Sequence, residues 1–174
     1  IPPLIAGVDV EIVAGRGPVF ASPVRTAADV AALPALDSLD FTPIREAIAI
    51  ITAELGSTPL IGFGGAPFTL ASYLIEGGPS KDQARARAMM LAEPATFSAL
   101  LAWCADATAQ FMRAQVEAGA SVVQLFDSWA GSLSRTNWQT HVAPHSASIF
   151  AALSDLDVPR IHFGLGMRDM LDLI

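Results

Sequence analysis

The sequence predicts an α/β fold built on a parallel sheet. Three short apolar runs have strand length, and proline and glycine bound the first and the third: Leu60–Phe63, Ser121–Phe126 and Arg160–Phe163. Segments with helical periodicity separate these runs, and the connections are only a few residues long. Such alternation favours right-handed crossovers between parallel strands. The first run is expected to be a strand buried on both faces.

The N-terminal part of the chain is expected to lie outside this sheet. Val8–Val13 alternates apolar and polar residues, and Pro18–Ala21 follows after a turn, which is typical of a half-exposed hairpin. Arg16 in the turn is interpreted as a solvated side chain. A short helix is expected over Thr26–Leu33, and Thr42 is expected to be the N-cap of a helix that ends at Gly56.

A glycine pair follows the first strand and precedes a helix expected over Thr69–Glu76. Gly64 and Gly65 could allow a positive φ or close approach of a flat ligand, or they could serve helix packing alone. Ser80 and Gln83 have capping-box spacing and predict a further helix reaching about Leu91.

The clearest predicted helix begins at Pro94 and stops at Gly119, with apolar residues recurring every three or four positions. Cys104 lies within this apolar stripe, which favours a buried core thiol. After the second strand come Asp127, Ser128 and Trp129. Thr136 and Gln139 predict another helix start, Pro144 predicts a kink or restart, and residues 167–174 have the pattern of one more helix.

Composition excludes several classes of function. Hydrophobic residues make up 52% of the 174 residues and charged residues 16%, and the net charge of -7 disfavours nucleic acids and anionic membrane surfaces. No apolar run approaches the roughly 18–20 residues needed to span a bilayer. The single cysteine permits no internal disulfide, so a cytoplasmic location is expected. An anionic polycarboxylate substrate is still compatible with an acidic chain if cations gather locally.

Two motifs carry a family resemblance. Gly65–Gly78 has the sequence GAPFTLASYLIEGG and Gln124–Gly131 has the sequence QLFDSWAG, and together they resemble the uroporphyrinogen decarboxylase family. The resemblance implies a (β/α)8 TIM barrel, of which residues 1–174 form a partial single domain lacking N-terminal and C-terminal portions. It also implies a homodimer that converts uroporphyrinogen III to coproporphyrinogen III by removing carboxyl groups from four acetate side chains, with no cofactor and no metal.

The same resemblance assigns substrate-binding residues. Tyr73 and Ser128 match substrate-binding hydroxyls, whereas Gly65 and Phe126 match positions packed near the macrocycle. Asp127 and Trp129 are taken as supporting residues. The family's catalytic aspartate would fall just before Ile1, and its N-terminal arginines and late histidine have no counterpart. No catalytic residue is therefore assigned, and the 174-residue chain alone is expected to be inactive.

Two other hypotheses are retained. A zinc-dependent methyltransferase of the same superfamily, acting on a corrinoid or a thiol, is disfavoured by the lone Cys104 because zinc there needs thiol and imidazole ligands. His141 and His145 have helical spacing, but Pro144 interrupts it, and His162 is expected to be a core or pocket-wall residue. The other hypothesis is an inactive truncated barrel that binds a tetrapyrrole or a partner chain.

Overall fold

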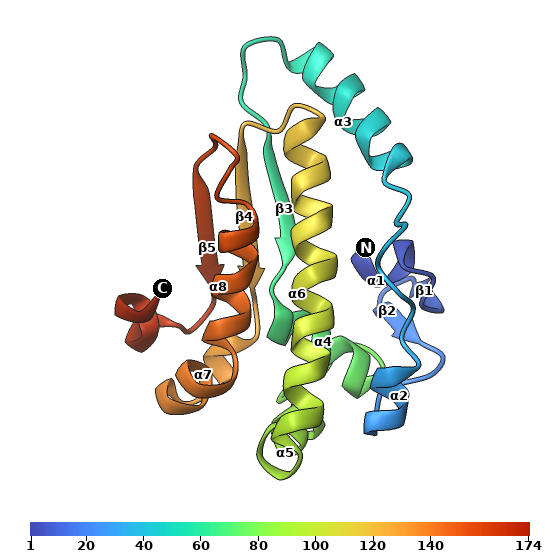
Figure 1. The fold of residues 1–174 in the computed structure, drawn as a ribbon, viewed down its shortest axis with the longest axis vertical. Coiled ribbons are helices and arrows are strands. Elements are labelled where there is room, and N and C mark those ends of the chain that lie inside the picture. The colour runs from blue at the N-terminus through green and yellow to red at the C-terminus, as the bar shows by residue number, and fades with distance from the viewer.

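Three parallel strands form the centre of the computed structural model, which describes residues 1–174 (Figure 1). β3 (Ile61–Gly65) pairs with β4 (Val122–Asp127), which in turn pairs with β5 (Arg160–Gly164). The helices between them make the crossovers that parallel strands require. The predicted α/β class, parallel sheet and three strands are therefore confirmed, whereas a closed barrel is not formed by these residues.

Helices cover only one face of this sheet. α6 (Pro94–Glu117) and α8 (Ala143–Ala152) contribute Met112, Ile149 and Leu153 to a cluster with Val123 and Leu125 of β4. The opposite face has no helix against it (Figure 1), and its large apolar side chains are partly exposed: Ile61, Phe63, Ile161 and Phe163. The prediction that the first strand is buried on both faces is therefore wrong, because successive side chains alternate and only one side is covered.

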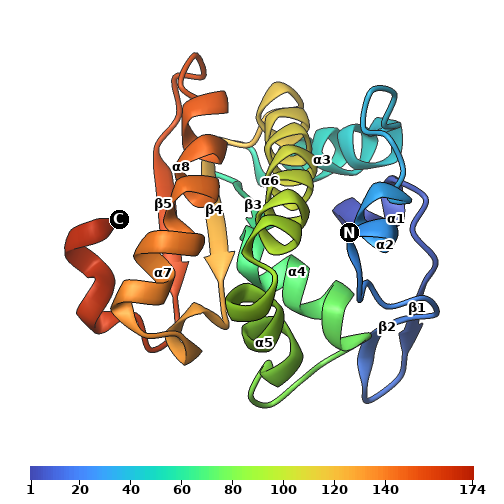
Figure 2. The same ribbon diagram turned by 60° about the horizontal axis from the view of Figure 1, so that its bottom comes forward.

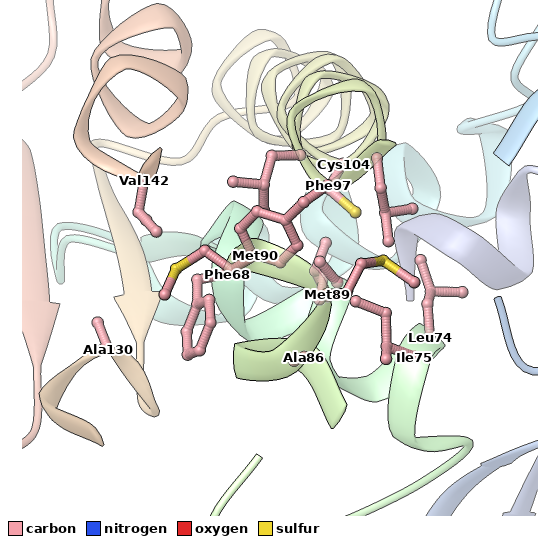
Figure 3. Packing of buried hydrophobic residues seen from close by; sticks show 14 of the residues in the cluster. Phe68, Leu74, Ile75, Ala86, Met89, Met90, Phe97, Cys104, Ala130 and Val142 are labelled. Carbon is pink, nitrogen blue, oxygen red and sulfur yellow. The ribbon is translucent and has the colours of Figure 1, made fainter. Parts of the chain in front are cut away.

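The largest hydrophobic core lies beyond the sheet, where α4 (Pro67–Glu76), α5 (Ala84–Ala92) and α6 meet (Figure 3). Phe68 of α4 packs edge-on against Phe97 of α6, and Met90 of α5 is fully buried beside them. Cys104 is also fully buried in this core, and burial raises the pKa of its thiol. The interpretation of Cys104 as a core thiol is confirmed.

A hairpin and three helices make up the N-terminal part. β1 (Val10–Val13) and β2 (Gly17–Phe20) form a separate antiparallel sheet, as predicted, and Arg16 in its turn is exposed. α1 (Pro2–Ile5) precedes the hairpin, and α2 (Ala27–Ala31) and α3 (Thr42–Leu55) follow it. Figure 2 shows the hairpin at one side of the molecule, next to α2 and remote from β5. The hairpin thus flanks the main sheet without joining it.

Two predicted helix starts are displaced by local hydrogen bonds. Thr42 is the first residue of α3 instead of its N-cap, and the Asp40 carboxylate accepts a hydrogen bond from the Thr42 N–H at 2.9 Å. Ser80 and Gln83 do contact each other, but Gln83 has a φ of 50° and closes a turn in front of α5. Both predicted segments therefore contain side chains that hydrogen-bond near a helix start, although α5 begins only after Gln83.

The C-terminal helices also differ in detail from the prediction. Ser134 caps α7 (Arg135–His141) by accepting from the Asn137 N–H, so the predicted pair Thr136 and Gln139 lies inside the helix. The restart at Pro144 is confirmed, since α8 begins at Ala143. A short 3₁₀ turn, η1 (Ala130–Ser132), follows β4, and a second, η2 (Arg168–Leu173), stands where an α-helix was expected.

One observation concerns membranes. No single helix combines the length and the apolar character of a membrane span; α5 and α6 meet that criterion only when joined, and they are bent by 120° at their junction.

Candidate functional site at the carboxyl ends of β3 and β4

Two predicted site residues are direct neighbours at the carboxyl end of the sheet. Gly65 is the last residue of β3 and lies opposite Phe126 of β4 in the parallel register. The Phe126 carbonyl accepts a hydrogen bond from the Ala66 N–H at 2.8 Å, and the Gly65 carbonyl accepts one from Thr108 Oγ1 at 2.9 Å. These bonds fix the strand ends from which the site residues project.

An aromatic row lies on the uncovered face of the sheet. The Phe126 ring contacts the rings of Phe63 and Phe163 edge-on, with centroids 5.6 and 5.5 Å apart. Phe63 remains 50% exposed and Phe163 39% exposed. The row is therefore an accessible apolar surface of the kind on which a flat ring system packs.

Tyr73 projects from α4 towards the end of β4. Its ring lies 4.2 Å from the Trp129 ring, centroid to centroid, and its hydroxyl forms no hydrogen bond within the chain. It also borders an apolar cavity of about 240 Å³ formed with α1, the hairpin and Leu70. Partial burial raises the pKa of the phenol, so at neutral pH it is a hydrogen-bond donor.

Ser128 occupies the turn that follows β4. It is half-buried and stands between Asp127, the last strand residue, and Trp129, which contacts Tyr73. Its hydroxyl likewise makes no hydrogen bond within the chain. The structure thus brings Tyr73, Ser128, Gly65 and Phe126 to one end of the sheet, where neither hydroxyl is hydrogen-bonded within the chain.

The glycine pair has a packing role. A Cβ at Gly64 would lie 2.7 Å from Thr108 Cγ2, and one at Gly65 would lie 2.9 Å from Leu70 Cδ2. Neither glycine has a positive φ. Of the two interpretations of this pair, helix packing is therefore the one that the local geometry supports.

Asp127 has a larger structural role than the sequence indicated. Its carboxylate is fully buried and accepts hydrogen bonds from Thr69 Oγ1 and Trp138 Nε1, both at 3.3 Å. His162 Nε2 lies 3.5 Å from Asp127 Oδ2 without a hydrogen bond, and the His162 side chain is 4% exposed and lines a small pocket with Trp138 and Phe150, as expected for a core or pocket-wall residue. The signal in the sequence was a charged residue at a position where strand alternation predicts burial.

The histidines do not gather around a common point. α7 ends at His141 and α8 begins at Ala143, so His141 and His145 belong to different helices. His145 Nε2 lies 3.1 Å from Ser98 Oγ, and burial lowers the pKa of the imidazole. No group of three or more metal-ligating side chains occurs in the chain.

The fold is that of an α/β protein in which the four residues assigned from the sequence lie at the carboxyl ends of parallel strands. The chain belongs to the Uroporphyrinogen decarboxylase (URO-D) family, whose family model matches residues 1–174. This confirms the resemblance carried by the two motifs.

Three curated uroporphyrinogen decarboxylases illustrate the similarity. Those of Mycolicibacterium paratuberculosis, Mycobacterium ulcerans and Rhodococcus opacus are 56%, 53% and 54% identical over 171 residues, which is 98% of this chain and 48% of each relative. The chain therefore spans about half the length of the curated relatives that it matches.

A solved methyltransferase from Methanosarcina mazei has a similar fold. It superposes with a TM-score of 0.75 over 98% of this chain and 50% of that protein, at 20% sequence identity. Because identity this low shows only the fold, the methyltransferase hypothesis is not favoured over the decarboxylases, which are 56% and 53% identical to this chain over the aligned 171 residues.

Proposed function

We propose that this chain is the substrate-binding part of a uroporphyrinogen decarboxylase that produces coproporphyrinogen III. The observation that carries the proposal is 53–56% identity to curated decarboxylases over 98% of the chain. The four residues assigned to the substrate are Tyr73, Ser128, Gly65 and Phe126, and their convergence at one end of the sheet supports it.

We also propose that the uncovered sheet face is part of the interior of a (β/α)8 barrel. A barrel of this type needs eight strands and on the order of 250 residues, and its ligand sites lie at the carboxyl ends of the strands. The three parallel strands and the position of the aromatic row fit one segment of such a barrel. A homodimer is proposed on family grounds alone.

In this proposal the macrocycle lies on the aromatic row of Phe63, Phe126 and Phe163. Gly65, opposite Phe126, lets Leu70 of α4 pack against the adjacent strand end, since a Cβ there would lie 2.9 Å from Leu70 Cδ2. The neutral Tyr73 phenol and the Ser128 hydroxyl donate hydrogen bonds to substrate carboxylates or to a pyrrole. The apolar cavity beside Tyr73 strengthens the bond from its phenol, since fewer water molecules compete.

The reaction itself depends on the electron-rich pyrrole of the substrate. Protonation of the pyrrole ring lets it accept the electron pair of the breaking C–C bond as carbon dioxide leaves. A second proton then converts the resulting methylene group to a methyl group, and loss of the first proton restores the pyrrole, so that one proton is consumed in all. The protein must orient the macrocycle and stabilise the charge that develops. On the described residues, the hydroxyl pair and the aromatic row perform the orientation.

Carboxylate recognition needs cations as well. Three arginines already pair with carboxylates on the surface: Arg45 with Glu117, Arg113 with Asp155 and Arg135 with Asp172. None of these pairs belongs to the strand-end site. We therefore propose that the 174-residue chain alone does not decarboxylate uroporphyrinogen and needs the remaining family elements for activity.

A chimera tests this function. Residues 1–174 would replace the matching half of the Mycolicibacterium paratuberculosis relative, and conversion of uroporphyrinogen III would be followed anaerobically by separating the porphyrins after oxidation. The chimera should form coproporphyrinogen III, whereas the 174-residue chain alone should not. An inactive, folded chimera beside an active relative would contradict the proposal, and binding of uroporphyrinogen without product would favour the non-catalytic hypothesis.

Two variants of the chimera locate the site. Tyr73→Phe and Ser128→Ala should each lower kcat/KM about 10- to 100-fold, which is what the loss of one hydrogen bond to a charged group produces. Ser57→Ala removes an exposed hydroxyl far from the strand ends and serves as the matched control. Unchanged kcat/KM in both site variants would remove these hydroxyls from the substrate site.

A further inference from the structure

We propose that Asp127 is a positioning residue that fixes the Ser128 turn and α4 relative to each other. The inference deepens the proposed function and rests on it for the activity measurements only. Asp127 lies at the carboxyl end of β4 on the buried side of the sheet, behind the residues assigned to the substrate.

The first step is the direction of the Asp127 side chain. Residues of β4 alternate in burial, and Val123, Leu125 and Asp127 all lie on the helix-covered side. Phe126 points to the uncovered face, where its ring meets Phe63 and Phe163. The Asp127 carboxylate therefore faces away from the aromatic row and does not reach a ligand lying there.

The second step is the set of groups around the carboxylate. Thr69 of α4 donates to Asp127 Oδ1, Trp138 of α7 donates to Oδ2, and His162 Nε2 of β5 lies 3.5 Å from Oδ2. Each group comes from a different element. A buried carboxylate is costly unless it is hydrogen-bonded, so this position is held by hydrogen bonds that join α4 and α7 to the end of β4, with His162 of β5 in contact beside them.

The third step connects the network to the site. Thr69 and Tyr73 are one helical turn apart on α4. Thr69 contacts Asp127 at the end of β4, and Tyr73 contacts Trp129 two residues further along the chain. Ser128 lies between the two contacts. Loss of the Thr69–Asp127 bond would leave the ring contact, and the Ala66 N–H bond to the Phe126 carbonyl at the start of α4, to hold the Tyr73 and Ser128 hydroxyls in register.

A positioning role can be separated from a need for negative charge. In Asp127→Asn, the amide oxygen can accept from Trp138 while the amide nitrogen donates to the Thr69 hydroxyl, because a hydroxyl is both donor and acceptor. The network is thus preserved without charge. Asp127→Ala removes it entirely, and Thr69→Val removes one bond while keeping a side chain of similar shape.

The variants would be compared in the chimera and in the 174-residue chain. In the chimera, Asp127→Asn should keep kcat within about threefold of the parent, and Asp127→Ala and Thr69→Val should lower kcat about 10- to 100-fold with a smaller change in KM, as expected for misplacement of the binding groups. Asp106→Ala, which alters an exposed aspartate of α6, is the control.

A second measurement does not depend on activity. Tyr73 is the only tyrosine, so its ionisation in the 174-residue chain can be followed by ultraviolet absorbance. Its midpoint should fall towards that of free tyrosine in Thr69→Val and stay unchanged in Asp127→Asn. If the parent chimera proves inactive, this titration still decides the positioning role. The proposal would be overturned if Asp127→Asn and Asp127→Ala lowered kcat equally. It would also be overturned if Thr69→Val left both kcat and the ionisation midpoint of Tyr73 unchanged.

Discussion

Replacing Gly64 by alanine tests whether this glycine serves packing between β3 and α6. The new Cβ would lie 2.7 Å from Thr108 Cγ2 and 3.1 Å from Met112 Cγ. Favourable carbon contacts are about 3.5–4.0 Å long, so the overlap with Thr108 is close to 1 Å. Overpacking of this kind costs about 1–3 kcal/mol, partly offset by about 0.4–1 kcal/mol from restricting the unfolded chain.

The expected net destabilisation is therefore on the order of 1–2 kcal/mol, which should lower Tm by about 2–8 °C for a chain of this size. Thermal unfolding followed by circular dichroism would measure it. Thr108→Ser removes the clashing Cγ2 while retaining the Oγ1 that donates to Gly65. Alone it should cost about 1 kcal/mol for the lost methyl group, but in the double variant the new Cβ occupies that space.

The double variant Gly64→Ala with Thr108→Ser should thus be more stable than Gly64→Ala, with a coupling of about 1 kcal/mol or more. A Gly64→Ala chain as stable as the parent would refute the packing argument. So would a Gly64→Ala defect that Thr108→Ser does not relieve, because the clash would then lie elsewhere.

Four further outcomes are expected. Gln115→Leu should destabilise the chain in urea by about 1–3 kcal/mol by leaving the part-buried backbone N–H and C=O of Phe63 in β3 unpaired, with exposed Gln139→Leu as control. Cys104 should resist thiol reagents until unfolding, since burial raises its pKa. Tyr73 should ionise above the usual value near 10, and since the unfolded chain ionises first, stability should fall as pH rises past that value. Asp172, whose pKa is lowered by Arg135, stabilises the chain above about pH 4 and loses this effect in acid; Asp172→Asn should weaken the acid sensitivity of unfolding.

Local sequence signals predicted the elements well where one physical cause acts alone. The stripe of apolar residues between Pro94 and Gly119 gave α6 nearly to its ends, and Pro144 marked the restart at α8. Helix starts were less predictable, because Asp40 and Ser134 compete as hydrogen-bond acceptors with the residues that the spacing rules favoured.

The site could be predicted only in part. The motifs pointed to Tyr73, Ser128, Gly65 and Phe126, and the fold gathers them, but their contact with substrate stays a prediction. The network of Asp127 was missed, since its partners lie 58, 11 and 35 positions away in the sequence and no spacing rule joins them.

The sequence by itself determined the class of fold and the family. Those properties follow from periodicity, turn residues and ungapped motifs, all of which are local. Only the tertiary structure decided that Gly64 lets α6 pack closely on β3 and that helices cover one face of the sheet. It also decided that Asp127 of β4 is hydrogen-bonded to α4 and α7. Such properties depend on which distant side chains meet, and the free energy of a buried charge or a tight contact is defined only once they have met.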